Sequence, residues 1–171
     1  MRIVTIFIIL AGVSAACMHG RGGNSQEEIA RGQAINVAKE YALHIMKDAR
    51  QSTDRNGIIT LSTDRMSYVI DPAKIVISEI DEDLERDAIV PLTLLKGQTF
   101  VMKEHLLILN AGEKMMIDTV LYDIINILKV EDRIINAEIS KVGMDSPGYG
   151  CAECMEIARY QFKSGKFVKT E

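Results

Sequence analysis

The sequence predicts an α+β domain in which an N-terminal amphipathic helix packs on a mostly antiparallel β-sheet. A helical apolar stripe occurs between residues 25 and 49, where apolar side chains recur at helical intervals. After residue 57 the sequence changes to short β-branched runs that are broken by Asp, Asn, Gly and Pro. Such runs are typical of strands joined by tight turns, and tight turns join antiparallel neighbours.

The length and composition limit the chain to about one domain. It has 171 residues, of which 47% are apolar and 26% are charged, which is the composition of a globular protein. The formal net charge of −4 excludes a generally basic nucleic-acid-binding protein, so we expect no nucleic-acid partner. Residues 79–87 hold six acids and one base, so the negative charge is concentrated in one segment.

The first sixteen residues have the pattern of a secretory signal peptide. The single base Arg2 precedes an apolar run over residues 3–13, and three small residues occupy positions 14–16. The apolar run has eleven residues, whereas a helix needs about 20 to cross a bilayer. We therefore expect residues 1–16 to direct export and then to be removed.

Cys17 follows this segment, and the stretch from Val13 to Cys17 resembles the lipobox of bacterial lipoproteins. The resemblance implies that Cys17 carries a diacylglyceryl group and becomes the mature N-terminus. Met18 at the next position is not Asp, which implies an outer-membrane destination, facing the periplasm or the surface. Ser14 stands where that family usually has Leu, so cleavage of a soluble exported protein is the alternative.

Residues 17–24 are expected to be the lipidated cysteine and a flexible tether, because three of the residues after Cys17 are glycines. Residues 25–171 are then the single α+β domain. Ser25 and Glu28 form a capping box, which predicts that the helix begins at Ser25. Turn-forming residues 51–57 end the helical pattern, and Gly57 is free to take a positive φ. The helical stripe consists of Ala30, Ala34, Val37, Ala38, Tyr41, Ala42, Ile45, Met46 and Ala49.

Nine strands are expected in the remainder of the chain. Residues 116–128 fit both helical and strand spacing, and we favour a strand for their later half, because residues 130–134 look like a hairpin turn. Residues 163–166 look like a second hairpin turn. The expected strands are Ile58–Leu61, Ser67–Ile70, Lys74–Glu79, Ala88–Leu95, Thr99–Leu109, Ile124–Val130, Ile134–Lys141, Met155–Lys163 and Lys166–Lys169.

The acidic segment has the ligand spacing of a calcium loop. Glu79, Asp81, Asp83 and Asp87 are oxygen donors, and Ca²⁺ takes six to eight oxygen ligands. Their spacing resembles the loop of FG-GAP and VCBS repeats, which precedes a hydrophobic strand, as it does here. Leu84 stands where those loops have Gly, at a turn that needs a positive φ. A solvated acidic hairpin is therefore the leading interpretation, with a calcium site and a docking surface for a basic partner as the alternatives.

Cys151 and Cys154 form a Cys-x-x-Cys pair, and in an exported protein we expect a disulfide between them. A redox centre is one alternative, although that role needs the pair at a helix N-terminus in a thioredoxin-like context. A zinc site is another, and it needs four ligands. A bridge across so short a loop constrains the unfolded chain little, so its expected role is to fix the turn before the last hairpin.

No established catalytic motif is found, whether a Gly-x-Ser-x-Gly elbow, a P-loop or a His-Glu-x-x-His sequence. His105 is expected at a half-exposed sheet position, and His44 in packing or at the surface. The sequence therefore predicts a lipid-anchored, non-enzymatic binding module of the cell envelope, with an envelope protein as its partner and no obligatory cofactor. The alternatives are an envelope thiol-disulfide protein and a calcium-dependent binding module.

Overall fold

The computed structural model describes residues 22–112, 114–143 and 151–170. The expected signal peptide and the proposed lipidation site Cys17 lie outside these residues. Within them, no helix combines the length and the apolar composition needed to cross a bilayer.

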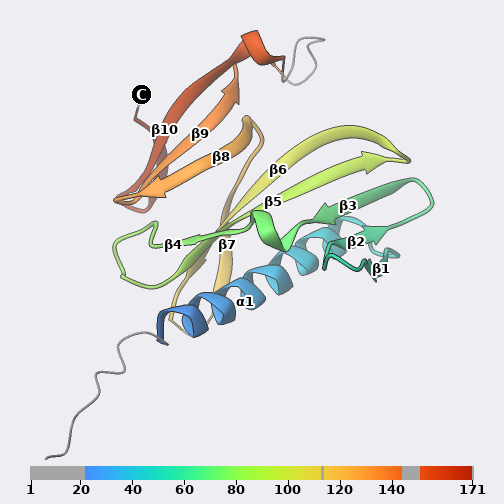
Figure 1. Ribbon diagram of the computed structural model, residues 1–171, viewed down its shortest axis with the longest axis horizontal. Coiled ribbons are helices and arrows are strands. Elements are labelled where there is room, and N and C mark those ends of the chain that lie inside the picture. The colour runs from blue at the N-terminus through green and yellow to red at the C-terminus, as the bar shows by residue number, and fades with distance from the viewer. Residues whose placement is uncertain (1–21, 113, 144–150, 171) are drawn as a thin grey trace, which may run out of the picture.

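The described chain forms three layers, with a helix on one side of a large antiparallel sheet and a small antiparallel sheet on the other (Figure 1). We call the large one sheet A, with strand order β1-β2-β3-β5-β6-β7 and β4 paired to β5, and the small one sheet B, with order β11-β10-β9-β8. The predicted α+β class is confirmed. The elements are α1 (Gly22–Ile45), β1 (Arg50–Thr53), β2 (Ile59–Ser62), β3 (Met66–Ile70), β4 (Val76–Ser78), β5 (Asp87–Lys96), β6 (Thr99–Asn110), β7 (Met115–Leu121), β8 (Ile124–Glu131), β9 (Ile134–Ser140), β10 (Met155–Lys163) and β11 (Lys166–Lys169), with short 3₁₀ turns at Pro72–Lys74 and Ala152–Cys154.

The predicted boundaries of the helix are wrong at both ends. Helix α1 begins at Gly22, so residues 22–24 are helical and Ser25 lies within the first turn. Glycine disfavours a helix but does not forbid one, so helical geometry can extend a few residues before Ser25. The helix ends at Ile45 rather than near residue 49, and the first three residues of the predicted turn 51–57 belong to strand β1, Arg50–Thr53.

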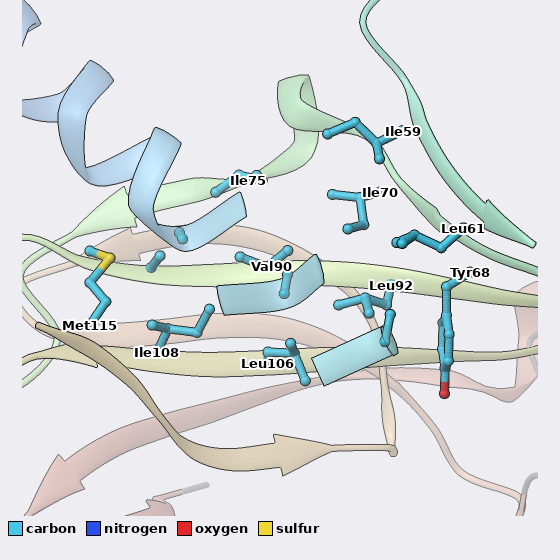
Figure 2. Close-up of a cluster of buried hydrophobic side chains, with 14 of the residues drawn as sticks. Ile59, Leu61, Tyr68, Ile70, Ile75, Val90, Leu92, Leu106, Ile108 and Met115 are labelled. Carbon is cyan, nitrogen blue, oxygen red and sulfur yellow. The ribbon is translucent and has the colours of Figure 1, made fainter. Parts of the chain in front are cut away.

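The packing face of α1 is a row of alanines four residues apart. Ala34, Ala38 and Ala42 are completely buried, as the stripe predicted. Their small side chains bring the helix close to sheet A, where Val90, Leu106 and Ile108 lie on the covered face (Figure 2). This contact builds the larger of two cores.

The ambiguous segment 116–128 consists of two strands joined by Tyr122 and Asp123. Strand β8 confirms the prediction for its later half, and β7 shows that the earlier half is also a strand. The register between β6 and β7 shifts between Leu107 and Ile108, which marks an irregularity of the bulge type. Because a bulge interrupts strict alternation, the apolar residues fall at intervals of three and four that imitate a helix.

Both expected hairpin turns are present. Asp132 and Arg133 join β8 to β9 with φ of 50° and 63°, and Ser164 and Gly165 join β10 to β11 with φ of 51° and 73°. Gly57 also has the predicted positive φ, of 80°. Positive φ at both central residues is the type I′ geometry that matches the twist of paired strands.

The middle of strand β6, residues 104–108, is buried on both faces. Leu106 and Ile108 face the helix core, whereas Leu107 packs in the second core, between sheets A and B. His105, predicted to be half-exposed, is 1% exposed because sheet B covers its face of the strand.

Candidate functional site

The acidic loop joins β4 to β5 and brings together three of its four predicted ligands. Carboxylate oxygens of Asp81, Asp83 and Asp87 lie within 4.8 Å of one another. Glu79 is not a member of this group. With one oxygen from each residue, this group supplies three of the six to eight oxygen ligands that Ca²⁺ takes.

Asp87 organises this loop from within the protein. Its side chain is fully buried, and Oδ2 accepts hydrogen bonds from the backbone N–H of Ile80 at 2.8 Å and of Asp81 at 3.2 Å. Oδ1 accepts the N–H of Asn110 at 3.0 Å, which ties the loop to the end of β6. Asp87 therefore serves three backbone donors.

The turn of the acidic loop has a positive φ at Leu84, where the resembling calcium loops have Gly. Leu84 takes a φ of 68°, the left-handed region that favours glycine, and its side chain is 70% exposed. Two carboxylates brace the turn, because Asp81 accepts the N–H of Asp83 at 3.0 Å and Asp83 accepts the N–H of Glu85 at 2.8 Å. The loop thus forms without a glycine at this position.

Burial raises the pKa of Asp81 and of Asp87, while backbone hydrogen bonds to each carboxylate oppose the shift. The neighbouring carboxylates add to the increase, since like charges disfavour ionisation. A bound cation would reverse this repulsion, so the cluster can respond electrostatically to a divalent ion.

Cys151 and Cys154 form a disulfide, with their Cα atoms 5.1 Å apart. The pair brackets a three-residue 3₁₀ turn and stands directly before β10. The carbonyl of Cys154 accepts the N–H of Lys141 at 2.7 Å, so this turn is bonded to the chain just after β9. Since no α-helix begins at the pair, the helix N-terminus that activates redox cysteines is not part of this arrangement.

A groove of about 620 Å³ separates α1 from the first residues of β7. Its apolar lining includes Val37 and Tyr41 from the helix, and Met115 and Ile117 from the strand. Met116 also lines it and is 53% exposed. The groove lies beside the edge strand of sheet A, and its lining also includes the charged residues Glu40 and Lys114 and the polar His44. An exposed sheet edge favours binding of another molecule.

One end of the groove adjoins a buried polar network that the sequence reasoning missed. Glu104 is 4% exposed, and its Oε1 accepts the hydroxyl hydrogen of Tyr68 at 3.0 Å. The rings of Tyr68 and Tyr41 have centroids 6.4 Å apart, and the Tyr41 hydroxyl interacts with Glu104 and Tyr122. Burial, followed by the charge of Glu104, raises the pKa of both Tyr41 and Tyr68.

A signal for this network was present in the sequence. The residues from Lys103 to His105 are polar and lie inside a predicted strand, just before the apolar run 106–109. A continuous apolar run predicts burial on both faces, and alternation then places Glu104 in one layer and its two neighbours in the other. Lys103 is half-buried, which lowers the pKa of its ammonium group, and Nζ donates to the Ile125 carbonyl at 2.9 Å and to Asn126 Oδ1 at 3.1 Å, which replaces part of its hydration.

The groove and the acidic loop thus differ in chemistry, because apolar and polar side chains together line the groove and the loop is strongly acidic. Comparison with known proteins assigns neither of them, since no protein-family model, no curated protein and no solved structure matches this chain.

Proposed function

We propose that this chain is a lipid-anchored protein of the bacterial cell envelope that acts by binding and not by catalysis. The observation that carries the proposal is Cys17, which directly follows an apolar export segment and three small residues. Acylation with two or three chains anchors a protein stably, whereas one chain is marginal. The protein would then face the periplasm or the surface from the outer membrane.

The groove between α1 and β7 supports the binding part of the proposal. It combines apolar side chains, such as Val37 and Met115, with the free edge of sheet A. An exposed sheet edge offers unpaired backbone groups, and apolar pockets beside it take side chains of a bound segment. An envelope protein or a small amphipathic molecule fits this surface.

A Cys17→Ala variant tests the anchor. We expect the wild-type chain to incorporate labelled palmitate and to sediment with membranes, and the variant to lose the label and enter the soluble fraction. Ser14→Leu is the matched control, because it restores the usual lipobox residue and should keep the label. A wild-type chain that is soluble and unlabelled would contradict the proposal.

Calcium binding by the acidic loop is a second candidate function, favoured by the convergence of Asp81, Asp83 and Asp87. We expect millimolar Ca²⁺ to raise the melting temperature of the protein more than Mg²⁺ does, because binding to the folded state alone stabilises it. Asp83→Asn should abolish the increase, and Glu82→Gln, outside the cluster, should preserve it. Equal melting temperatures with and without Ca²⁺ would exclude this function.

A further inference from the structure

Strand β7 is an edge strand of sheet A that lacks the usual protection against pairing. Natural sheets protect their edges with lysines, prolines, bulges or very short strands. Strand β1 is short, polar and exposed throughout, β11 is equally short with a lysine at each end, and β8 has two register shifts against β9. Strand β7 has seven residues, of which only Asp118 is charged. Its outer edge therefore offers backbone hydrogen-bonding groups to another strand.

The part of β7 that can pair regularly is also the part that borders the groove. The register with β6 is regular up to Ile117 and again from Thr119, which leaves Asp118 as an extra residue. An extra residue of this kind disrupts the ladder locally. Residues 114–117 precede it, and all four line the groove. A segment paired with them directs alternate side chains into the groove, against Val37 of α1.

Lys114 places a positive charge at the start of this stretch. Its side chain is exposed, and it takes part in none of the ion pairs within residues 22–112, 114–143 and 151–170. Because Lys114 directly precedes β7, a segment that runs antiparallel to β7 has its C-terminal end there. A free C-terminal carboxylate at that point is complementary in charge to Lys114.

The negative charge of the groove lies toward its other end. Gln33 of α1 and Gly112, just before β7, line a common hollow. Further along the helix, Tyr41 interacts with Tyr122, just after β7, so α1 and β7 run in the same direction. Glu40 precedes Tyr41 and lines the groove on that side. A carboxylate is therefore attracted at the start of β7 and repelled further along, which favours the antiparallel direction.

We propose that the edge of β7 binds the C-terminal segment of a partner protein as an additional antiparallel strand, with its carboxylate beside Lys114. Alternate side chains of the segment are apolar, because Val37, Met115 and Ile117 line the groove that takes them. The inference rests on the groove as the binding surface of the function proposed above, but it does not depend on acylation of Cys17.

A second copy of this chain is the competing occupant of the edge, and charge disfavours it. Symmetric antiparallel pairing of Met115–Leu121 with its own copy places Asp118 opposite Asp118. Like charges directly opposite each other destabilise a strand pair. A separate peptide has no such restriction.

Fluorescein-labelled peptides of the pattern Thr-x-Thr-x, where x is Val, Ile, Leu, Met or Phe, test the inference. Each has a free C-terminal carboxylate, and fluorescence anisotropy measures its binding to the purified full-length chain in a non-ionic detergent. We expect saturable binding by members of the set. The C-terminal amide of the tightest peptide should bind roughly three- to fivefold more weakly, which is the effect of one exposed ion pair.

N-methylation of the peptide backbone distinguishes strand addition from docking of side chains alone. In an added strand, only alternate amides face β7. Of two isomers that are methylated at neighbouring residues, we expect one to bind at least about tenfold more weakly and the other to bind as the parent peptide does. Hydrogen exchange of the backbone amides in residues 115–117 should slow when the parent peptide is bound.

Three variants locate the carboxylate and the groove. Lys114→Gln should abolish the difference in affinity between the carboxylate and amide forms of the peptide, and its exposed position makes the fold insensitive to the change. Lys96→Gln is the matched control, at an exposed lysine outside the groove, and should preserve the difference. Val37→Ala, in the wall of the groove, should weaken binding of both forms alike.

Each contrary outcome overturns the inference in a recognisable way. Absence of saturable binding by every peptide of the set at millimolar concentration would remove the peptide site, whereas the acylation test of Cys17 decides the anchor separately. Equal affinities of the two methylated isomers would show docking without strand pairing. A difference between the carboxylate and amide forms that persists in Lys114→Gln would move the carboxylate elsewhere. A chain that sediments as a dimer, and that the peptide converts to a monomer, would identify a second copy as the occupant of β7.

Discussion

Two buried carboxylates of this protein are held in opposite ways. Asp87 accepts three backbone hydrogen bonds, so both of its carboxylate oxygens are paired. Glu104 accepts one, from a tyrosine hydroxyl, and keeps one oxygen unpaired. The difference teaches that burial alone does not define a role: Asp87 ties its loop to the end of β6, whereas Glu104 leaves one oxygen without a hydrogen-bond partner.

The largest effect expected from this comparison is the loss of Asp87. Asp87→Ala leaves three backbone donors without an acceptor, and we expect the free energy of unfolding to fall by about 3 kcal/mol or more. Asp87→Asn is the matched variant and should lose less, because its amide oxygen still accepts. Urea denaturation measures both, and a change below about 1 kcal/mol in Asp87→Ala would show that the clamp is dispensable.

His105, the neighbour of Glu104 on the opposite face of β6, extends the comparison to the pH dependence of stability. Burial, with a smaller contribution from Lys103, lowers the pKa of His105 from 6.5 to about 3. Below pH 6.5 the unfolded chain therefore binds a proton that the folded chain does not, so stability is lost as the pH falls. Between pH 6.5 and 5 this loss should reach about 2 kcal/mol, and denaturation at several pH values measures it.

The His105→Gln variant should remove this part of the pH dependence. His44→Gln is the matched control, because His44 is exposed on the helix and its replacement should leave the profile as it is. Parallel stability profiles for wild type and His105→Gln would contradict the assignment.

Leu84 tests how much stability the acidic loop loses by having a leucine, and not a glycine, at a positive φ. Leu84→Gly relieves a positive φ that costs an L-residue roughly 1–2 kcal/mol, and glycine's extra chain entropy offsets part of the gain. We expect a net stabilisation of about 0.5 kcal/mol, measured by denaturation. Leu128→Gly, at another exposed leucine but within β8, should destabilise instead. Loss of stability in Leu84→Gly would mean that this side chain has contacts of importance.

The smallest effect on stability is expected at Glu104. In Glu104→Gln the amide oxygen can still accept the Tyr68 hydroxyl, and the side chain keeps its size, so the one hydrogen bond of this oxygen is kept. We expect the free energy of unfolding to change by no more than a few tenths of a kcal/mol, in contrast to Asp87→Asn. A loss above about 2 kcal/mol in urea denaturation would place Glu104 in the same structural class as Asp87 and break the comparison.

The parts of the fold that were predictable are those with a local pattern. The alanine row of α1 and the two hairpin turns were readable because each is encoded within a few residues. Strand β1 was missed because Arg50–Thr53 is polar and exposed on every side chain, so it has no alternation to detect. Strand β7 was obscured by the irregular register beside Leu107.

The two candidate sites also differ in whether a local sequence pattern encodes them. The ligands of the acidic loop lie within nine residues, so spacing alone revealed them. The network around Glu104 is built from α1, β3, β6 and the residue after β7, and only tertiary packing brings these segments together. His105 was placed wrongly because polar residues precede it on the strand, although the apolar run that follows on β6 indicates burial on both faces.

The two residues between the sheets have a consequence for folding. Tyr122 interacts with Tyr41 on the helix side, and the carboxylate of Asp123 accepts the Tyr160 hydroxyl of sheet B at 2.9 Å. The chain passes once from sheet A to sheet B, and β8 to β11 pair with one another in the order of the sequence (Figure 1). Sheet B is thus a block of low contact order, which can assemble quickly and exchange its amide hydrogens as a cooperative unit of its own. The boundary of that unit falls at Tyr122 and Asp123.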